Sequence, residues 1–233
     1  MSVTFIAEIG MNHNGNFGLL HELIKQAAQS KADIAKFQLG WRDGPEEINN
    51  ITDDTIELIL KLCEYYSVEP MFSIIKDRAY EQIKKFNLKK YKIASRTVVE
   101  NPELVKKILS EGKETFLSLG RWDSKMKPFV EFKNVRYLWC KSLYPTAIWD
   151  LKGFPLKFNS NTCEGISDHC IGLEVALLAI ARGATIVEKH FTLDKSDTTI
   201  RDHALSLLPS EFKNLVELGN GISKATKTIE VLE

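Results

Sequence analysis

Two apolar stretches that end in histidine, joined by one apolar helix, constrain the fold of this chain most strongly. Residues 165–169 (GISDH) and 186–191 (IVEKHF) each turn from apolar to polar, and the apolar segment 172–183 between them closes with a glycine. This pattern predicts a β–α–β unit, whose strands are parallel neighbours joined by a right-handed crossover. His169 and His190 should then emerge at the same end of adjacent strands, where two imidazoles can hold one metal ion.

The same alternation of strand and helix runs through the rest of the chain. Helical spacing is clear in residues 17–30, where leucine, isoleucine and alanine recur three and four positions apart. Two segments, 124–132 and 147–153, are short and irregular instead. The predicted strands are 4–9, 34–39, 70–75, 90–94, 114–119, 135–141, 163–167 and 185–190, and the predicted helices are 17–30, 53–66, 77–86, 102–112, 172–182 and 210–232.

Eight strand–helix units in 233 residues predict a closed (β/α)8 TIM barrel, an α/β fold that forms a single domain over residues 1–233. An open, doubly wound sheet is the alternative. No GxGxxG sequence follows the first predicted strand, which disfavours a dinucleotide-binding version of that alternative.

Composition narrows the class of partner. The 31 basic residues equal the 31 acidic ones and form no long run, which disfavours nucleic-acid binding through a bulk basic field. No apolar stretch approaches the roughly 20 residues of a membrane span and no signal peptide is recognisable, so we expect a cytoplasmic protein without a membrane partner. The cysteines lack CxxC spacing and are expected to be reduced thiols; they are Cys63, Cys140, Cys163 and Cys170.

Nearly every predicted strand ends in a polar residue, at the end of the barrel where active sites of this fold lie. A polar group inside a barrel needs a partner, because burying it alone costs several kcal/mol. One such residue would be read as a satisfied core group or a capping hydroxyl, whereas a complete ring indicates a site. The ring comprises Glu8, Lys36, Gln38, Ser73, Lys92, Ser95, Arg96, Ser118, Arg121, Lys141, Ser142, Tyr144, Ser167, His169, Glu188 and His190.

The residue types in this ring suggest two kinds of binding. Lysines, arginine and serine hydroxyls suit a phosphate or carboxylate, and two histidines with a nearby carboxylate suit a divalent metal. Such a metal can polarise a carbonyl or activate a water. Neither an HExxH nor a GxxxxGK[ST] motif is present, which disfavours a metalloprotease and a P-loop nucleotidase.

With these residues in place, the sequence resembles the N-acetylneuraminate (sialic acid) synthase family over most of its length. The resemblance rests on an opening motif and on the SDH and EKHF motifs, in this order and spacing. The matching segments are 6–15 (IAEIGMNHNG), 32–38 (ADIAKFQ), 92–95 (KIAS), 117–118 (LS), 144–146 (YPT), 165–169 (GISDH), 183–184 (GA), 188–192 (EKHFT) and 202–203 (DH) with Ser206.

The resemblance implies a (β/α)8 barrel that condenses phosphoenolpyruvate with an open-chain amino sugar aldehyde, giving a 2-keto-3-deoxy sugar acid and phosphate. His169 and His190 match the family's ligands for a divalent metal, most often Mn2+, with Mg2+ or Co2+ as possibilities. Glu8 matches an acidic residue near the metal and the aldehyde. Positions that hold phosphoenolpyruvate match Lys36, Lys92, Ser95, Ser118 and Ser167, and positions on the sugar side match Gln38, Tyr144 and Asp202. To these we add Ser73, Arg121 and Ser142 as substrate-binding candidates, on their place in the ring alone.

The sequence departs from the family's pattern mainly on the acceptor side. Arginine stands at position 121 where the family has methionine after its Ser-Thr-Gly, and Ile200 and Arg201 replace a Gly-Pro. Other departures are Trp139, Thr97 and the pair 74–75. The family's C-terminal antifreeze-like domain is expected to be absent, so a homodimer would need another interface. We therefore expect an unusual acceptor, a sugar or a sugar phosphate. Three arginines lie near the predicted mouth and either recognise this acceptor or are solvated rim residues: Arg96, Arg121 and Arg201.

Two other classes remain open from the sequence. One is a non-catalytic relative that binds phosphoenolpyruvate or a sugar. The other is a different aldolase or lyase on the same barrel, in which a lysine forms a Schiff base with a ketone; the candidates are Lys36, Lys92, Lys141 and Lys189.

Overall fold

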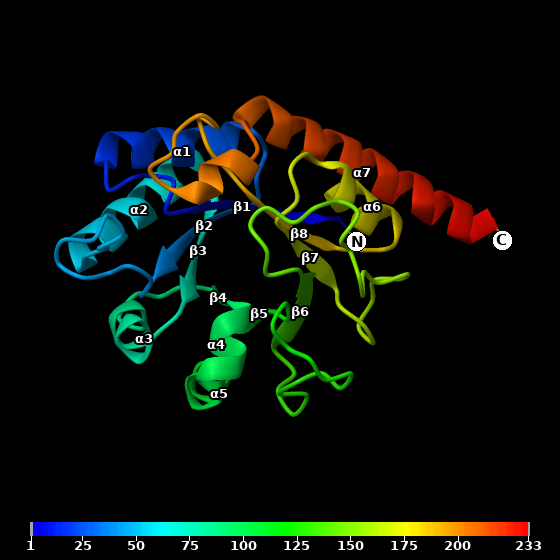
Figure 1. Ribbon diagram of the computed structural model, residues 1–233, viewed down its shortest axis with the longest axis horizontal. Coiled ribbons are helices and arrows are strands. Elements are labelled where there is room, and N and C mark those ends of the chain that lie inside the picture. Colours follow the sequence, from blue (N-terminus) through cyan, green and yellow to red (C-terminus); the bar gives the residue numbers. More distant parts are fainter. Residues whose placement is uncertain (1, 233) are drawn as a thin grey trace.

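The computed structural model describes residues 2–232, with side chains through residue 229. These residues form one closed barrel of parallel strands in chain order, in which β8 returns to pair with β1 (Figure 1). The predicted (β/α)8 fold class is confirmed, and the open sheet is excluded. The strands are β1 (Thr4–Gly10), β2 (Ile34–Leu39), β3 (Glu69–Ile74), β4 (Lys90–Ile93), β5 (Glu114–Ser118), β6 (Val135–Cys140), β7 (Gly165–Asp168) and β8 (Ile186–His190).

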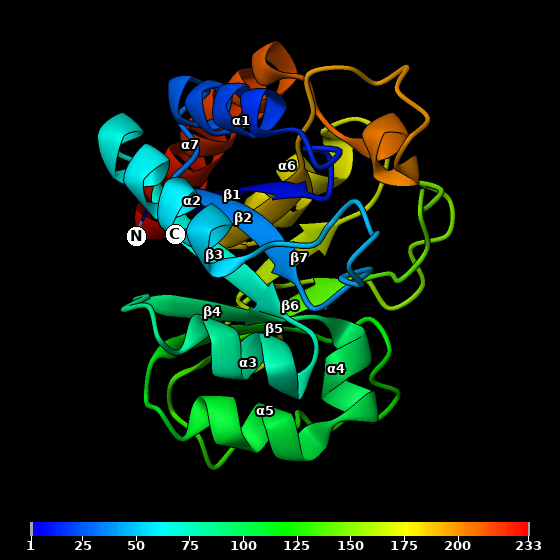
Figure 2. The ribbon, with the colours of Figure 1, turned by 90° about the vertical axis from the view of Figure 1, so that its left-hand side faces the viewer.

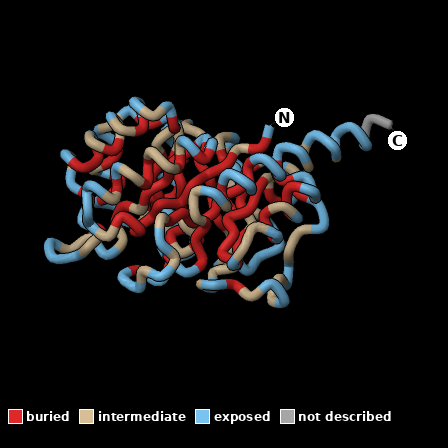
Figure 3. The backbone as a smooth tube through the Cα atoms, turned by 90° about the horizontal axis from the view of Figure 1, so that it is seen from above, coloured by how far each residue is buried: buried red, intermediate tan, exposed pale blue. Residues whose placement is uncertain are grey.

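Helices cover the outside of the barrel, except between residues 119 and 134 and between 141 and 164, where the chain is largely irregular. In Figure 2, α3 to α5 lie beside β4 and β5, and α1, α6 and α7 lie on the opposite side. The far end of α7 extends beyond the barrel and is exposed (Figure 3). The helices are α1 (Phe17–Gln29), α2 (Asp53–Tyr66), α3 (Asp77–Ile83), α4 (Ser95–Glu100), α5 (Pro102–Leu109), α6 (Glu174–Ala181), the 3-10 helix η1 (Arg201–Leu205) and α7 (Pro209–Leu232).

The predicted elements agree with these bounds to within three residues, but α4 and η1 were not predicted. Helix α4 begins directly after β4, and its first turn has no side-chain cap that the sequence could reveal. By contrast, Asn16 caps α1 and Asn101 caps α5, where Pro102 takes the first helical position.

The barrel interior has two layers, which follow from the two-residue period of a strand. The lower layer is an apolar cluster separate from the larger core between strands and helices. Its members are Ile6, Ile34, Met71, Phe116, Leu138 and Ile186. Two residues further along these strands, towards their C-terminal ends, lie Glu8, Lys36, Ser73, Ser118, Cys140 and Glu188, all buried. Moving two residues along each strand therefore takes the barrel interior from an apolar layer to a polar chamber.

Gly165 of β7 contributes no side chain to the lower layer, because its space is taken by Ile186 of β8. A Cβ atom at position 165 would lie 2.6 Å from Ile186 Cβ and would clash with the backbone carbonyl of Ile186. We expect Gly165→Ala to lower the free energy of unfolding by about 1–3 kcal/mol or more. Gly221→Ala is the matched control, since nothing lies within 4 Å of a Cβ there and the site is helical; it should stabilise by about 0.5–1 kcal/mol. Urea denaturation measures both, and equal effects would contradict this account.

The four cysteines are buried and free, as predicted. No helix among the described residues is long and apolar enough to cross a membrane.

Candidate active site

The centre of the polar chamber is a buried cluster of two lysines and two glutamates. Lys36 Nζ lies 2.6 Å from Glu8 Oε2 and 3.7 Å from Glu188 Oε2. Lys92 Nζ lies 3.4 Å from Glu188 Oε1. Each of the four side chains is at most 5% exposed, so these charges depend on one another and not on water. Glu188 joins the two lysines.

Polar groups from neighbouring strands complete the cluster. Ser167 Oγ donates a hydrogen bond to Glu188 Oε1 at 2.7 Å, and Lys92 Nζ donates one to Ser118 Oγ at 2.8 Å. The remaining contacts are Gln38 Nε2 to Glu8 Oε1 at 3.0 Å, Lys36 Nζ to Ser73 Oγ at 3.4 Å and Ser95 Oγ with Ser142 Oγ at 2.9 Å.

The two lysines differ in their proton affinity. Burial alone would lower the pKa of Lys36, but Glu188 and Glu8 outweigh burial and raise it. The pKa of Lys92 is lowered, mainly by burial, because Glu188 compensates it only in part and Lys36 repels it. Burial acts to raise the pKa of Glu188, yet the two lysines hold that pKa low. An anion entering beside Lys92 would supply the negative charge that this lysine lacks.

His169 and His190 emerge together at the mouth, as predicted from the β–α–β unit. Their ring centroids are 5.5 Å apart, and the ring of Tyr144 packs 4.2 Å from that of His169. His169 Nδ1 donates to the carbonyl of Lys141 at 2.7 Å, which leaves its Nε2 available as a ligand. His190 Nδ1 is buried and has no hydrogen-bond partner in the described part of the chain; the Asp202 carboxylate is 3.9 Å away.

This pair fits a shared metal ion. Metal–nitrogen bonds of about 2.1 Å place the centroids of two imidazoles on one ion roughly 4.5–6.4 Å apart, a range that includes the observed separation. Burial and the neighbouring His190 lower the pKa of His169 to about 4, so its imidazole is in the neutral, ligating form at neutral pH. The described residues do not gather three or more His, Cys, Asp or Glu side chains around one point. Substrate or water would therefore complete the coordination.

The low pKa of His169 predicts acid sensitivity of the metal-free protein. The unfolded chain binds a proton at this residue below about pH 6.5, whereas the folded protein does so only near pH 4, so stability is lost as pH falls between these values. Between pH 7 and pH 5 we expect a loss of about 2 kcal/mol from this residue. Urea denaturation in chelator measures it, and His169→Asn, which does not titrate, should show a shallower dependence. An unchanged slope in that variant would contradict the prediction.

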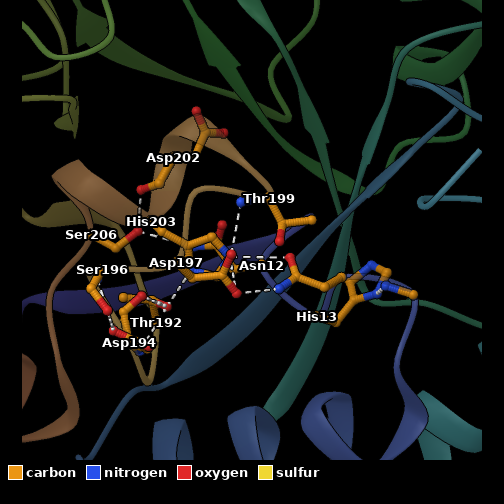
Figure 4. A network of polar contacts seen from close by, with 12 residues as sticks. Asn12, His13, Thr192, Asp194, Ser196, Asp197, Thr199, Asp202, His203 and Ser206 are labelled. Carbon is orange, nitrogen blue, oxygen red and sulfur yellow. Dashed lines mark hydrogen bonds and ion pairs between the residues drawn. The ribbon is translucent and has the colours of Figure 1, made fainter.

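A polar clasp holds the loop after β8 over the mouth (Figure 4). Asn14, from the loop after β1, donates to Asp197 Oδ2 at 2.6 Å, and its amide oxygen accepts from His203 Nε2 at 3.1 Å. Asn12 Nδ2 donates to the Phe191 carbonyl and to Ser206 Oγ, each at 3.0 Å. These contacts join the first and last strands and fix residues 198–202, which wall one side of the chamber.

The chamber opens into one cavity of about 810 Å3. Every substrate, catalytic and metal residue predicted from the sequence lines it: Glu8, Lys36, Gln38, Ser73, Lys92, Ser95, Ser118, Arg121, Ser142, Tyr144, Ser167, His169, His190 and Asp202. Their assigned roles stay predictions. Sequence reasoning left Glu188 out of this set, although its place two residues before His190 was the available signal. It also missed Trp41, Arg42, Thr198 and Thr199, which lie on loops without a recognisable pattern.

Two of the lysines considered for a Schiff base lie outside this lining. Lys189 Nζ is fully buried and paired at 2.8 Å with Asp168. Asp168 alternates with Ser167 and His169 along the strand and lies on the outer face of the barrel. Lys141 Nζ pairs with Asp150 at 2.8 Å. Neither lysine is positioned to meet a substrate in the cavity.

Comparison with known proteins gives a consistent result. The NeuB family matches residues 46–230. An N,N'-diacetyllegionaminic acid synthase and a pseudaminic acid synthase, both of Campylobacter jejuni, are each 32% identical; the alignments cover 96% and 92% of this chain and 79% and 72% of theirs. The crystal structure of a sialic acid synthetase from Leptospira borgpetersenii superposes with a TM-score of 0.81 at 27% identity, over 97% of this chain and 85% of that one.

Proposed function

The chain belongs to the NeuB family, and we propose that it condenses phosphoenolpyruvate with the open-chain aldehyde of an amino sugar. The products would be a 2-keto-3-deoxy sugar acid and inorganic phosphate. The observation that carries this proposal is the convergence, in one cavity, of two buried lysines, serine hydroxyls from five strand ends and two adjacent imidazoles. That set suits an anionic enol ester beside a polarised carbonyl.

Phosphoenolpyruvate would bind on the floor of the chamber. Its phosphate and carboxylate require fixed cations and hydroxyl donors, which Lys36, Lys92 and Ser118 supply there. Lys92 is the less well compensated cation, with a pKa lowered mainly by burial, and a bound anion would stabilise its charge. Glu188 would keep the two lysines apart and aligned while the site is empty.

His169 and His190 would hold a divalent ion, Mn2+ for preference, which would polarise the aldehyde oxygen of the acceptor. The enol carbon of phosphoenolpyruvate attacks the aldehyde carbon and forms the new carbon–carbon bond. The alkoxide takes a proton, for which the ion pair of Lys36 and Glu8 supplies an acid. Water adds at carbon 2, and cleavage of the bond between that carbon and the phosphate oxygen releases phosphate and leaves the ketone. The protein raises the rate by stabilising the charges that develop in these steps.

The proposal is tested by incubating the protein with manganese, phosphoenolpyruvate and a panel of amino sugars, and measuring phosphate release. We expect release that depends on both the sugar and the metal and that a chelator stops. Binding of phosphoenolpyruvate without release for any sugar would instead identify a non-catalytic relative. Trapping of a substrate adduct by borohydride would identify a Schiff-base enzyme.

A further inference from the structure

Positive charge is concentrated at the rim of the cavity. The chain carries no formal net charge, yet the described lining residues include six lysines and arginines against three acidic residues. The two lysines lie on the floor, where Glu8 and Glu188 match them in number. The rim carries four arginines, Arg42, Arg96, Arg121 and Arg201. Arg42 pairs with Glu47 and Arg201 with Asp202, whereas Arg96 and Arg121 share one carboxylate, that of Glu100.

Arg96 and Arg121 converge on a single oxygen atom. Arg96 Nε and Arg121 Nη1 each lie 3.3 Å from Glu100 Oε1. The guanidinium of Arg96 also stacks over the ring of Trp41, 4.7 Å from its centroid, which restricts its orientation. Two planar guanidinium groups aimed at one carboxylate oxygen are arranged as they would be around a phosphate or a carboxylate.

Glu100 is a weak occupant of this position. Its side chain is 56% exposed, and exposed ion pairs contribute only about 0–1 kcal/mol. One carboxylate also leaves one of the two positive charges uncompensated. A ligand anion with more oxygen atoms could bind the two arginines beside Glu100, or displace Glu100 from them, at a small cost in free energy.

The pair lies across the mouth from the histidines. Arg96 follows β4 and Arg121 follows β5, whereas His169 and His190 belong to the β7–β8 side of the closed barrel. A ligand with its aldehyde at the histidines would have to extend across the opening to reach the arginines. An acceptor sugar could reach both the histidines and the arginines if it carried an anionic group at the end away from its aldehyde.

We propose that Arg96 and Arg121 form a subsite for an anionic group, a phosphate or a carboxylate, carried by the acceptor sugar at the end opposite its aldehyde. This inference rests on the proposed function for the identity of the acceptor. The arginines at the rim would then select among acceptor sugars, and the lysines on the floor would bind phosphoenolpyruvate.

The test compares N-acetylmannosamine with N-acetylmannosamine 6-phosphate, which differ only in the distal anion. We expect the wild type to prefer the phosphorylated sugar. In the double variant Arg96→Gln/Arg121→Gln, the KM for that sugar should rise roughly tenfold to hundredfold, because hydrogen bonds to a charged group are lost. The KM for phosphoenolpyruvate should not change. Arg136→Gln, which alters an exposed arginine on β6 that pairs with Glu114, is the matched control and should behave as wild type.

Two further variants separate a binding role from a structural one. Arg121→Lys keeps the charge but loses the planar fork, and should give an intermediate KM. Glu100→Gln removes the competing carboxylate, and should tighten binding of the phosphorylated sugar by up to about fivefold without affecting the neutral sugar. A purely structural role for these residues predicts no such gain.

Several results would overturn the subsite. A rise in the KM for phosphoenolpyruvate and not for the sugar would assign the arginines to the phosphate of phosphoenolpyruvate. An unchanged preference between the two sugars in the double variant would remove the subsite while the proposed function stands. If no sugar supports turnover, calorimetric titration decides. Weaker binding of the sugar phosphate to the double variant, with phosphoenolpyruvate binding unaffected, supports the subsite although the proposed function has failed. Equal binding of the sugar phosphate to both proteins overturns the subsite.

Discussion

Replacing Glu188 with alanine should lower the free energy of unfolding by roughly 3–5 kcal/mol. Glu188 lies between Lys36 and Lys92 on the floor of the cavity, where all three side chains are at most 5% exposed, and its removal leaves Lys92 without the carboxylate nearest to it. The cost of an uncompensated buried charge exceeds what an ordinary surface ion pair contributes. Urea denaturation at pH 7 measures the loss.

Two comparisons give this prediction its specificity. Glu217→Ala removes a carboxylate that pairs with Lys31 at 3.0 Å on the surface, and it should cost less than about 1 kcal/mol. Phosphoenolpyruvate should raise the melting temperature of the Glu188→Ala variant more than that of the wild type, because the ligand supplies the missing negative charge. Equal losses for Glu188→Ala and Glu217→Ala would show that the cluster does not depend on its central carboxylate.

Replacing His190 with alanine should reduce kcat/KM for the condensation by about a thousandfold. The reason is that polarisation of a carbonyl by a bound metal contributes several kcal/mol to the rate, and each 1.4 kcal/mol is a factor of about ten. The ring of His190 lies 5.5 Å from that of His169, and its buried Nδ1 has no hydrogen-bond partner among the described residues. We expect the variant to fold and to bind phosphoenolpyruvate, since the lysines on the floor are unchanged.

Manganese binding supplies a second measurement that does not depend on turnover. The wild type should bind one ion per chain in a titration, and His190→Ala should bind it far more weakly. His21→Ala is the matched control, because His21 is exposed on α1 and forms a hydrogen bond with Tyr66. This variant should change neither kcat/KM nor the affinity for manganese. Full activity in His190→Ala would show that His169 and His190 do not bind a metal ion that the reaction needs.

The barrel and its polar chamber could be predicted because both follow from short-range periodicity. The step from Ile34 to Lys36, or from Ile186 to Glu188, is one strand period, and it repeats around the ring. The β–α–β unit fixed the side on which His169 and His190 meet. These inferences need only local pattern and the handedness of the crossover.

The rim could not be predicted in the same way, because contacts between distant loops determine it. Nothing in the sequence near Trp41 indicates that Arg96 stacks on it, and the contact exists only once the loop after β2 and helix α4 are both in place. Residues 198–202 are ordered by side chains such as Asn14, which is more than 180 positions away. Helix η1 was missed for the same reason.

The polar clasp between the loop after β1 and the loop after β8 has a consequence for biosynthesis. Asn12 is translated 179 residues before Phe191 and 194 residues before Ser206, its two hydrogen-bond partners. A nascent chain that has not yet released these residues from the ribosome has the floor lysines and no finished wall opposite them. The mouth can therefore be completed only after residues 191–206 have left the ribosome, whatever the order in which the earlier strands pair.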